Sequence, residues 1–268
     1  MSFISAAMWS VCAISAFDVF FVLLQEMVGA STELDLVSRV LCEAAGFVGT
    51  LFLLTLVHER ERPLSDVLAL RRTPVLLLVL AVLVGIAMQG PINLMTTVIY
   101  DRYPLPDEQV ALLRHLFDVK ATHQRVAIVV AAGVIGPVVE EMLFRGGILR
   151  GLLRRQSAVR TVIGIAVFFA LAHREPRNFL PDFVGGVAMG YARIASGSLW
   201  PAIAVHAAFN TTSVALALLY GPDVDVLTRG QNWIATALWV ALGAAFLLFA
   251  DKSELCAAAR GSDVAPET

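Results

Sequence analysis

The chain has 268 residues, of which 58% are hydrophobic and 16% are charged, and its net charge is −2. Soluble domains are about 45–50% apolar and about 25% charged, so this composition excludes an ordinary soluble domain and predicts a polytopic membrane protein. The sequence has no basic tract of the kind that binds nucleic acid, so we expect no nucleic-acid partner. Its three cysteines are far apart and form no CxxC pair, so they indicate neither a disulfide framework nor a zinc ribbon.

Long apolar runs predict the elements of the fold. A helix needs about 17–25 apolar residues to cross a bilayer. Eight runs meet or approach that length, which predicts an all-α bundle of about eight transmembrane helices over residues 6–24, 41–57, 75–100, 126–144, 162–172, 183–195, 200–219 and 233–250. The first run lacks a preceding Lys or Arg, so we expect a retained span rather than a signal peptide. Segment 101–125 has apolar residues at helical spacing between charges and predicts an amphipathic helix in the membrane interface.

The runs also predict the organisation of the chain. No internal repeat or low-complexity linker divides it, so we expect one membrane domain over 1–250 and a polar, disordered tail over 251–268. The short, glycine-containing runs between about 125 and 215 are typical of helices buried by protein, so they predict the functional core, with the other spans packed around it. Twelve of the 20 Lys and Arg residues lie on the side that includes the C-terminal tail, which predicts cytoplasmic termini.

A charged cluster ends the fourth apolar run. Glu140, Glu141 and Arg145 follow a continuous apolar stretch. A charge within a membrane segment is costly, so such residues suggest a functional site. A solvated helix end is the alternative explanation. Glu141 and Arg145 are four residues apart, which allows an ion pair on one helical face, whereas Glu140 points about 100° away.

Further polar residues lie in the neighbouring runs. Phe169 precedes His173 by four residues, and His206 precedes Asn210 by the same spacing, so each pair shares a helical face. Taken singly, each residue has a structural explanation, such as an interfacial side chain or an interhelical hydrogen bond. Together they place one or two glutamates, two histidines and an asparagine on consecutive spans of the core.

This set of side chains suits the hydrolysis of an amide. A buried glutamate can act as a base that activates water, one histidine can hold the same water, and a second histidine and an asparagine amide can stabilise the oxyanion. Alternatively, Glu140, His173 and His206 could hold a divalent metal such as zinc, whose bound water would be the nucleophile. The residues do not separate these two chemistries. The sequence lacks HExxH, so it is not a zincin.

The three motifs in this order resemble those of the CPBP family, which comprises the type II CAAX prenyl endopeptidases and the bacteriocin-processing or Abi intramembrane proteases. The resemblance covers about residues 125–215 and rests on Glu140-Glu141-x-x-x-Arg145, Phe169-x-x-x-His173 and His206-x-x-x-Asn210.

The resemblance implies an α-helical bundle and an intramembrane endopeptidase. It implies that Glu140 is the general base, that His173 shares its water, and that His206 and Asn210 stabilise the oxyanion. Glu141, Arg145 and Phe169 would support the site. We favour the mechanism that requires no metal cofactor.

We therefore expect an integral, multi-pass endopeptidase of a bacterial or archaeal cell membrane. Its partners would be the lipid bilayer and a membrane-associated or lipidated protein or peptide, cut at a C-terminal tail or a leader. Two other functions stay open: a non-catalytic immunity or binding protein, and a proton-coupled transporter. A transporter would usually show inverted repeats of broken helices, and none is evident in the sequence.

Overall fold

The computed structural model describes residues 1–29, 34–222 and 226–264, and the regular structure within these ranges is entirely helical. The predicted all-α class is therefore confirmed. The helices outside the long central one are α1 (Phe3–Val28), α2 (Leu36–His58), α3 (Leu64–Val67), α4 (Val75–Ala87), α5 (Gln89–Arg102), α6 (Asp107–Phe117), α10 (Ala158–Ala172), the 3₁₀ turn η3 (Pro176–Asn178), α11 (Phe179–Ser196), α12 (Leu199–Tyr220), α13 (Arg229–Lys252) and α14 (Glu254–Val264).

Each of the eight predicted runs lies within helical structure. Among the described residues, six helices are long and apolar enough to cross a membrane: Phe3–Val28, Leu36–His58, Val75–Arg102, Thr122–Leu153, Leu199–Tyr220 and Arg229–Lys252. The runs predicted over 162–172 and 183–195 correspond to α10 and α11, which fall outside this set. The exact number of spans therefore stays a prediction.

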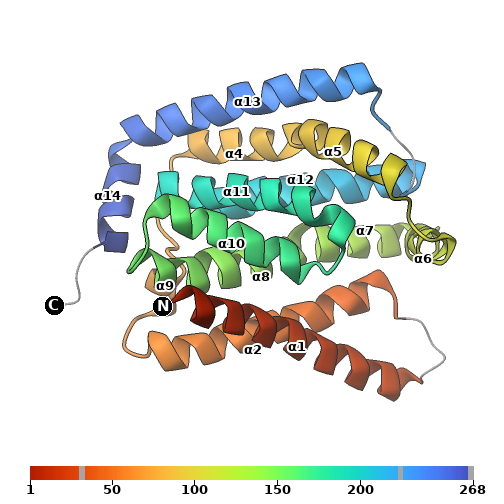
Figure 1. Ribbon diagram of the computed structural model, residues 1–268, viewed down its shortest axis with the longest axis horizontal. Coiled ribbons are helices and arrows are strands. Elements are labelled where there is room, and N and C mark those ends of the chain that lie inside the picture. Colours follow the sequence, from red (N-terminus) through yellow and green to blue (C-terminus); the bar gives the residue numbers. More distant parts are fainter. Residues whose placement is uncertain (30–33, 223–225, 265–268) are drawn as a thin grey trace.

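The helices form layers (Figure 1). α1 and α2 pack on each other at one side of the bundle, and α4, α5 and α13 lie at the opposite side. Between these layers run α10, α11, α12 and the long central helix. The N-terminus and α14 lie at one end of the bundle, and α6 lies at the other.

The central helix is continuous over Thr122–Leu153 but contains two wider π-helical turns. Its parts are α7 (Thr122–Val130), η1 (Ala131–Ile135), α8 (Gly136–Glu141), η2 (Met142–Ile148) and α9 (Leu149–Leu153). The end expected at about residue 144 is wrong. Arg145 is fully buried, and a Cβ at Gly147 would lie 3.0 Å from Cδ1 of Leu51. The helix continues past residue 144 for two reasons. Close contact with α2 compensates for the glycines, and a buried partner compensates for the charge of Arg145.

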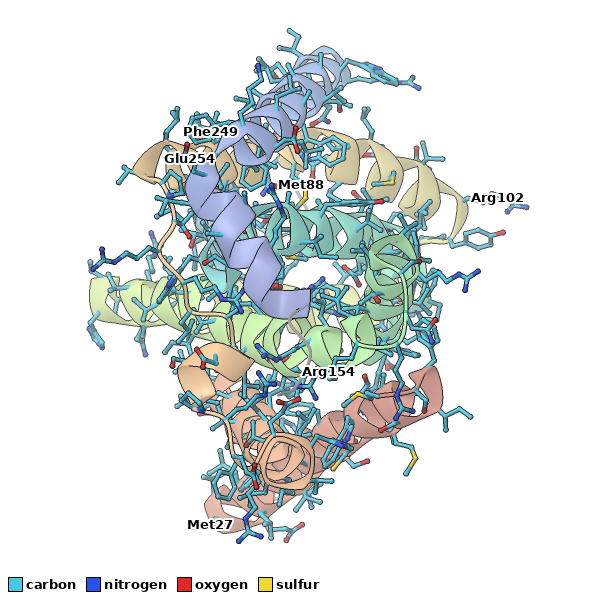
Figure 2. The ribbon with its side chains drawn as sticks, turned by 90° about the vertical axis from the view of Figure 1, so that its left-hand side faces the viewer. Met27, Met88, Arg102, Arg154, Phe249 and Glu254 are labelled. Atoms are coloured by element: carbon cyan, nitrogen blue, oxygen red, sulfur yellow. The ribbon has the colours of Figure 1, made fainter. Side chains whose placement is uncertain are left out.

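The C-terminal segment also differs from expectation. Residues 254–264 form α14, so the predicted disorder is wrong for this part, and residues 265–268 lie outside the described residues. Nη1 of Arg260 donates to the carbonyls of Ala195 (2.6 Å) and Ala250 (3.0 Å), near the C-termini of α11 and α13. A cation at a helix C-terminus is favourable, which explains why α14 docks. Figure 2 looks onto this end, where Glu254 begins α14 and Arg154 lies beyond its far end.

Candidate active site

The centre of the site is a buried network of three charged or polar side chains. Oε1 of Glu141 accepts hydrogen bonds from Nη1 of Arg145 at 2.8 Å and from Nδ1 of His206 at 2.9 Å. Glu141 and Arg145 have no exposed side-chain surface, and His206 is 5% exposed. The ion pair expected from the spacing of Glu141 and Arg145 is therefore present, and His206 on α12 joins it.

Arg145 is held from two further directions. Its Nη2 donates to the carbonyl of Gly186 on α11 at 3.1 Å, and its guanidinium carbon lies 4.4 Å from the centroid of the Phe169 ring. A Cβ at Gly186 would lie 3.0 Å from Cα of Ala166, so the glycine allows α11 to approach α10 closely. Backbone acceptors and an aromatic face compensate for burying a guanidinium group.

Phe169 contacts both histidines. Its ring centroid lies 4.7 Å from that of His173 and 5.7 Å from that of His206, with edge-on geometry in both cases. Nδ1 of His173 lies 2.9 Å from the carbonyl oxygen of Phe169, in the preceding turn of the same helix. A carbonyl only accepts, so this bond places the proton on Nδ1 and leaves Nε2 of a neutral ring with its lone pair.

Two side chains of α12 bind the first π-helical turn. Nδ2 of Asn210 donates to the carbonyl of Ala132 at 3.3 Å, and Oγ1 of Thr211 donates to the carbonyl of Gly133 at 3.1 Å. A wide turn displaces carbonyls from the regular hydrogen-bond ladder, and π-helical turns occur often at functional sites. Because Asn210 has two amide hydrogens, this bond leaves one for another acceptor.

A cavity of about 70 Å³ joins three of the predicted residues, His173, His206 and Asn210. A water molecule occupies about 30 Å³ in the liquid, so the space is comparable to about two waters. The other lining residues lie between α4 and α5 and in α5, α10, α11 and α12, and they are mostly apolar: Met88, Ile92, Phe169, Pro181, Asp182, Gly185, Met189 and Phe209.

Glu140 is placed differently from the other motif residues. It is 6% exposed, and its Oε2 has no hydrogen-bond partner among the described residues. It is not among the residues that line the small cavity. It lies within range of charge–charge interaction with Glu43, Glu141 and Asp182. The site thus brings together His173, His206, Asn210 and Phe169, with Glu140 buried beside them and unpaired at Oε2.

Two carboxylates of the site were not predicted from the sequence. Oδ2 of Asp182, in the first turn of α11, lies 3.9 Å from Nδ1 of His173. Glu43 of α2 interacts electrostatically with His173 and Glu140. Both are acidic residues at or within apolar helices, which is the signal that drew attention to Glu140.

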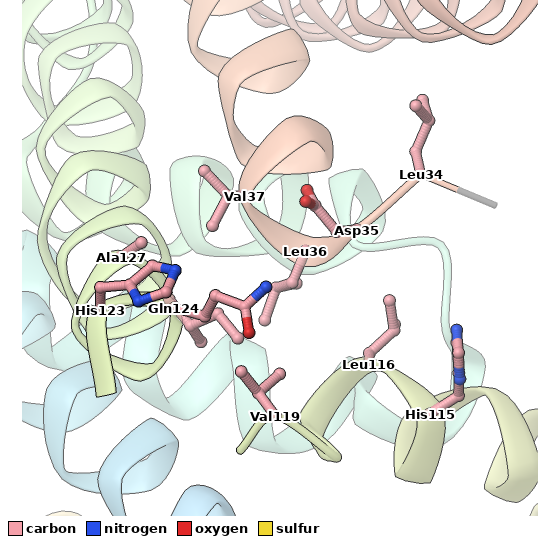
Figure 3. A pocket seen from close by; sticks show the side chains of 11 residues that line it. Leu34, Asp35, Leu36, Val37, His115, Leu116, Val119, His123, Gln124 and Ala127 are labelled. Atoms are coloured by element: carbon pink, nitrogen blue, oxygen red, sulfur yellow. The ribbon is translucent and has the colours of Figure 1, made fainter. Parts of the chain in front are cut away.

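A second cavity, of about 280 Å³, lies away from this site (Figure 3). It is formed where the N-terminal end of α2 meets α6 and α7, with Leu36, Leu116 and Val119 among its apolar lining residues. Its polar lining residues are Asp35, His115, His123 and Gln124. None of the predicted site residues lines it.

The side chains as placed do not form a metal site. Within the described ranges, no group of three His, Cys, Asp or Glu side chains is arranged to hold a metal ion. The three candidate ligands do not gather around one point, and Nδ1 of each histidine is already hydrogen bonded, to Phe169 in one case and to Glu141 in the other.

Comparison with known families gives an independent result. Residues 122–212 match the family model described as type II CAAX prenyl endopeptidase Rce1-like. This segment is similar to that family. The matched segment contains all three motifs and supports membership of the CPBP family, as the motifs predicted. No curated protein and no solved structure matches the chain.

The family implies a CAAX-type intramembrane protease. The six long apolar helices and the similarity of residues 122–212 to this family support an integral, multi-pass membrane protein.

Proposed function

We propose that the chain is an intramembrane endopeptidase that hydrolyses a peptide bond with a glutamate-activated water and without a metal. The observation that carries this proposal is the small cavity in which His173, His206 and Asn210 meet beside the buried, unpaired carboxylate of Glu140. Hydrolysis of an amide needs a base near a water and donors near the developing oxyanion, and this set of groups can provide both.

Glu140 is the proposed general base. Its Oε2 makes no hydrogen bond to a described residue, so it is free to accept a proton from water. His173 would hold the same water through Nε2, because Nδ1 is engaged by the carbonyl of Phe169. Since Glu140 does not line the small cavity, a change of its side-chain rotamer on substrate binding is part of this proposal.

His206 and Asn210 are the proposed oxyanion donors. The contact of Nδ1 of His206 with Glu141 orients the ring and leaves Nε2 for the substrate. Nε2 can donate only when both ring nitrogens carry protons, so this role requires the imidazolium form, with the Glu141 carboxylate as its counter-ion. The second amide hydrogen of Asn210 would be the other donor. Glu141 and Arg145 thus act through His206 rather than on the substrate.

The proposed substrate is a membrane-associated or lipidated protein or peptide, cut at a C-terminal tail or leader. The test is cleavage of tagged candidate membrane substrates by Glu140→Gln and, separately, His206→Ala. We expect Glu140→Gln to lose at least about 10²–10⁴-fold in kcat, the usual contribution of a general base. Full processing by both folded variants would contradict the proposal. Phe20→Leu, on the outer face of α1, is a control with 42% exposure.

The absence of a metal requirement has its own measurement. Elemental analysis of purified, active protein should find substoichiometric zinc and other divalent metals, and chelation should leave kcat unchanged. Zinc at one ion per chain, with activity lost on chelation and restored by zinc, would contradict the metal-free mechanism. The proteolytic function would stand in that case.

A further inference from the structure

The loop after His173 carries charged residues for which the motifs give no role. His173 caps the C-terminus of α10 and is 39% exposed, and residues 174–178 follow before α11 begins. The ring's short hydrogen bond is to Phe169 in its own helix, so that bond moves with α10. Nδ1 of His173 also lies 3.9 Å from Oδ2 of Asp182 on α11, so the surroundings of the ring depend as well on the loop that joins α10 to α11.

Arg174, the next residue, is held in an unusual conformation. Its φ is 57°, a left-handed value that L residues other than glycine rarely adopt. Its Nη2 donates to Oδ1 of Asp18 on α1 at 2.7 Å, and its guanidinium carbon lies 5.8 Å from the Phe17 ring centroid. A surface of α1, more than 150 residues away in the chain, thus fixes the residue beside His173.

The other end of the loop is anchored to a different part of the bundle. Arg177 donates from Nη1 to the carbonyl of Pro104 at 2.8 Å and from Nη2 to Oε1 of Gln109 on α6 at 3.2 Å. Its Nε also donates to Oε1 of Glu175 at 2.7 Å, and the hydroxyl of Tyr100 donates to Oδ1 of Asn178 at 2.5 Å. The loop is therefore anchored to α1 on one side and to the α5–α6 segment on the other.

We propose that Asp18 and Arg174, with Arg177 as the second anchor, are positioning residues that hold His173 in its catalytic orientation. The inference rests on the proposed function, because it assigns these residues to the water-holding histidine. A catalytic group displaced by about 1 Å can cost roughly 10²-fold in rate, so a loop that is fixed at both ends can determine kcat without touching substrate. The unfavourable backbone of Arg174 persists because the Asp18 contact holds it.

Arg174→Gly separates positioning from stability. Glycine accepts a φ of 57° without strain, so this variant removes the contact with Asp18 while relieving the backbone. We expect kcat to fall by about 10- to 100-fold. KM and the thermal midpoint should stay near the wild-type values. Asp18→Asn should lower kcat similarly, and Arg174→Lys, which keeps a cation for Asp18, should restore most of it.

Glu59→Gln is the control for an ion pair of equal length but greater burial, since Glu59 is 4% exposed and Asp18 is 48% exposed. Nη2 of Arg154 lies 2.7 Å from Oε2 of Glu59, the same separation as in the Arg174–Asp18 pair, but at the end of the bundle that carries α14. This variant should lower the thermal midpoint and leave kcat unchanged. If Arg174→Gly keeps wild-type kcat, or if kcat in Asp18→Asn falls no more than in Glu59→Gln, the positioning role is wrong.

A spectroscopic readout distinguishes failure of this inference from failure of the proposed function. In ¹⁵N-histidine spectra, assigned with His173→Gln, the His173 signal should shift in Asp18→Asn and in Arg174→Gly but not in Glu59→Gln. An unmoved signal overturns the positioning role even if Glu140→Gln abolishes cleavage. A moved signal, together with full cleavage by Glu140→Gln and His206→Ala, would refute the protease proposal while the structural coupling stands.

Discussion

Nδ1 of His206 lies 2.9 Å from Oε1 of Glu141, a residue 65 positions earlier in the chain. The same oxygen accepts from Arg145 at 2.8 Å. One carboxylate oxygen therefore connects the central helix to α12, and it does so in a place without exposed surface. Glu141 is thus a structural centre through Oε1, although Oε2 of Glu141 and Oε2 of Glu140 both lack a hydrogen-bond partner among the described residues.

Removing the charge of Glu141 should destabilise the fold more than removing that of Glu140. Glu141→Gln leaves Arg145 buried without its anion, and breaking a buried ion pair in this way costs about 3–5 kcal/mol. Glu140→Gln has no hydrogen bond at Oε2 to lose. Thermal denaturation in detergent should therefore show a clearly lower midpoint for Glu141→Gln. Equal midpoints for the two variants would contradict the assignment.

Phe169→Leu tests the aromatic contact with Arg145. Leucine keeps the apolar character but removes the ring face 4.4 Å from the guanidinium carbon. We expect a loss of about 1–2 kcal/mol in the free energy of unfolding, the value of a desolvated cation–π contact, and a reduced kcat because both histidines contact this ring. Phe20→Leu on the outer surface of α1 is the comparison, and equal losses would refute the role of the ring.

Gly85→Ala tests the close approach of α4 to α12. A Cβ at this position would overlap the carbonyl oxygen of Val205, the residue before His206. We expect a cost of about 1–3 kcal/mol and a lower kcat, because α12 must move. Gly49→Ala on α2 is the matched control, since its Cβ would meet no atom within 4 Å. That change should stabilise the helix by about 0.5–1 kcal/mol. If Gly85→Ala keeps the stability and the kcat of the wild type, α12 can shift without effect and the prediction is wrong.

Glu175 should make the stability of the loop depend on pH. Hydrogen bonds from Arg177 hold the pKa of Glu175 below its ordinary value. A carboxyl whose pKa is lowered by folding contributes stability above its unfolded pKa of about 4.3, and loses it as the pH falls through the lower folded value. Glu175→Gln should therefore have a slightly lower thermal midpoint than wild type at neutral pH, and the difference should shrink as the pH falls through the lowered folded pKa of Glu175. A difference that persists in acid would contradict this account.

The sequence carried enough information for the class of fold and for the contacts made along single helices. The Glu141–Arg145 pair and the Phe169–His173 contact follow from a spacing of four residues, and both are present. The contact of Glu141 with His206 depends on how two helices pack, and no local pattern specifies it. The same holds for Asp182 and Glu43, which reach His173 from α11 and α2.

Two errors have a common physical cause. The central helix was expected to end at about residue 144, and the C-terminal segment was expected to be disordered, because each contains charges and small residues. Both segments are helical because tertiary contacts satisfy their charges. Arg145 binds Glu141 and Gly186, and Arg260 binds the carbonyls of Ala195 and Ala250. Local composition does not reveal such partners.

The two π-helical turns, Ala131–Ile135 and Met142–Ile148, have a consequence for how the central helix can vary. An ordinary α-helix keeps one angular phase along its length, and a wide turn resets that phase by accommodating an extra residue. The segment with Glu140 and Glu141 lies between the two wide turns. The direction in which its side chains point is therefore not set by the helical phase of the segments before and after it. A one-residue deletion within a wide turn can therefore be absorbed as a regular turn, whereas a deletion in Gly136–Glu141 would rotate the carboxylates away from α12.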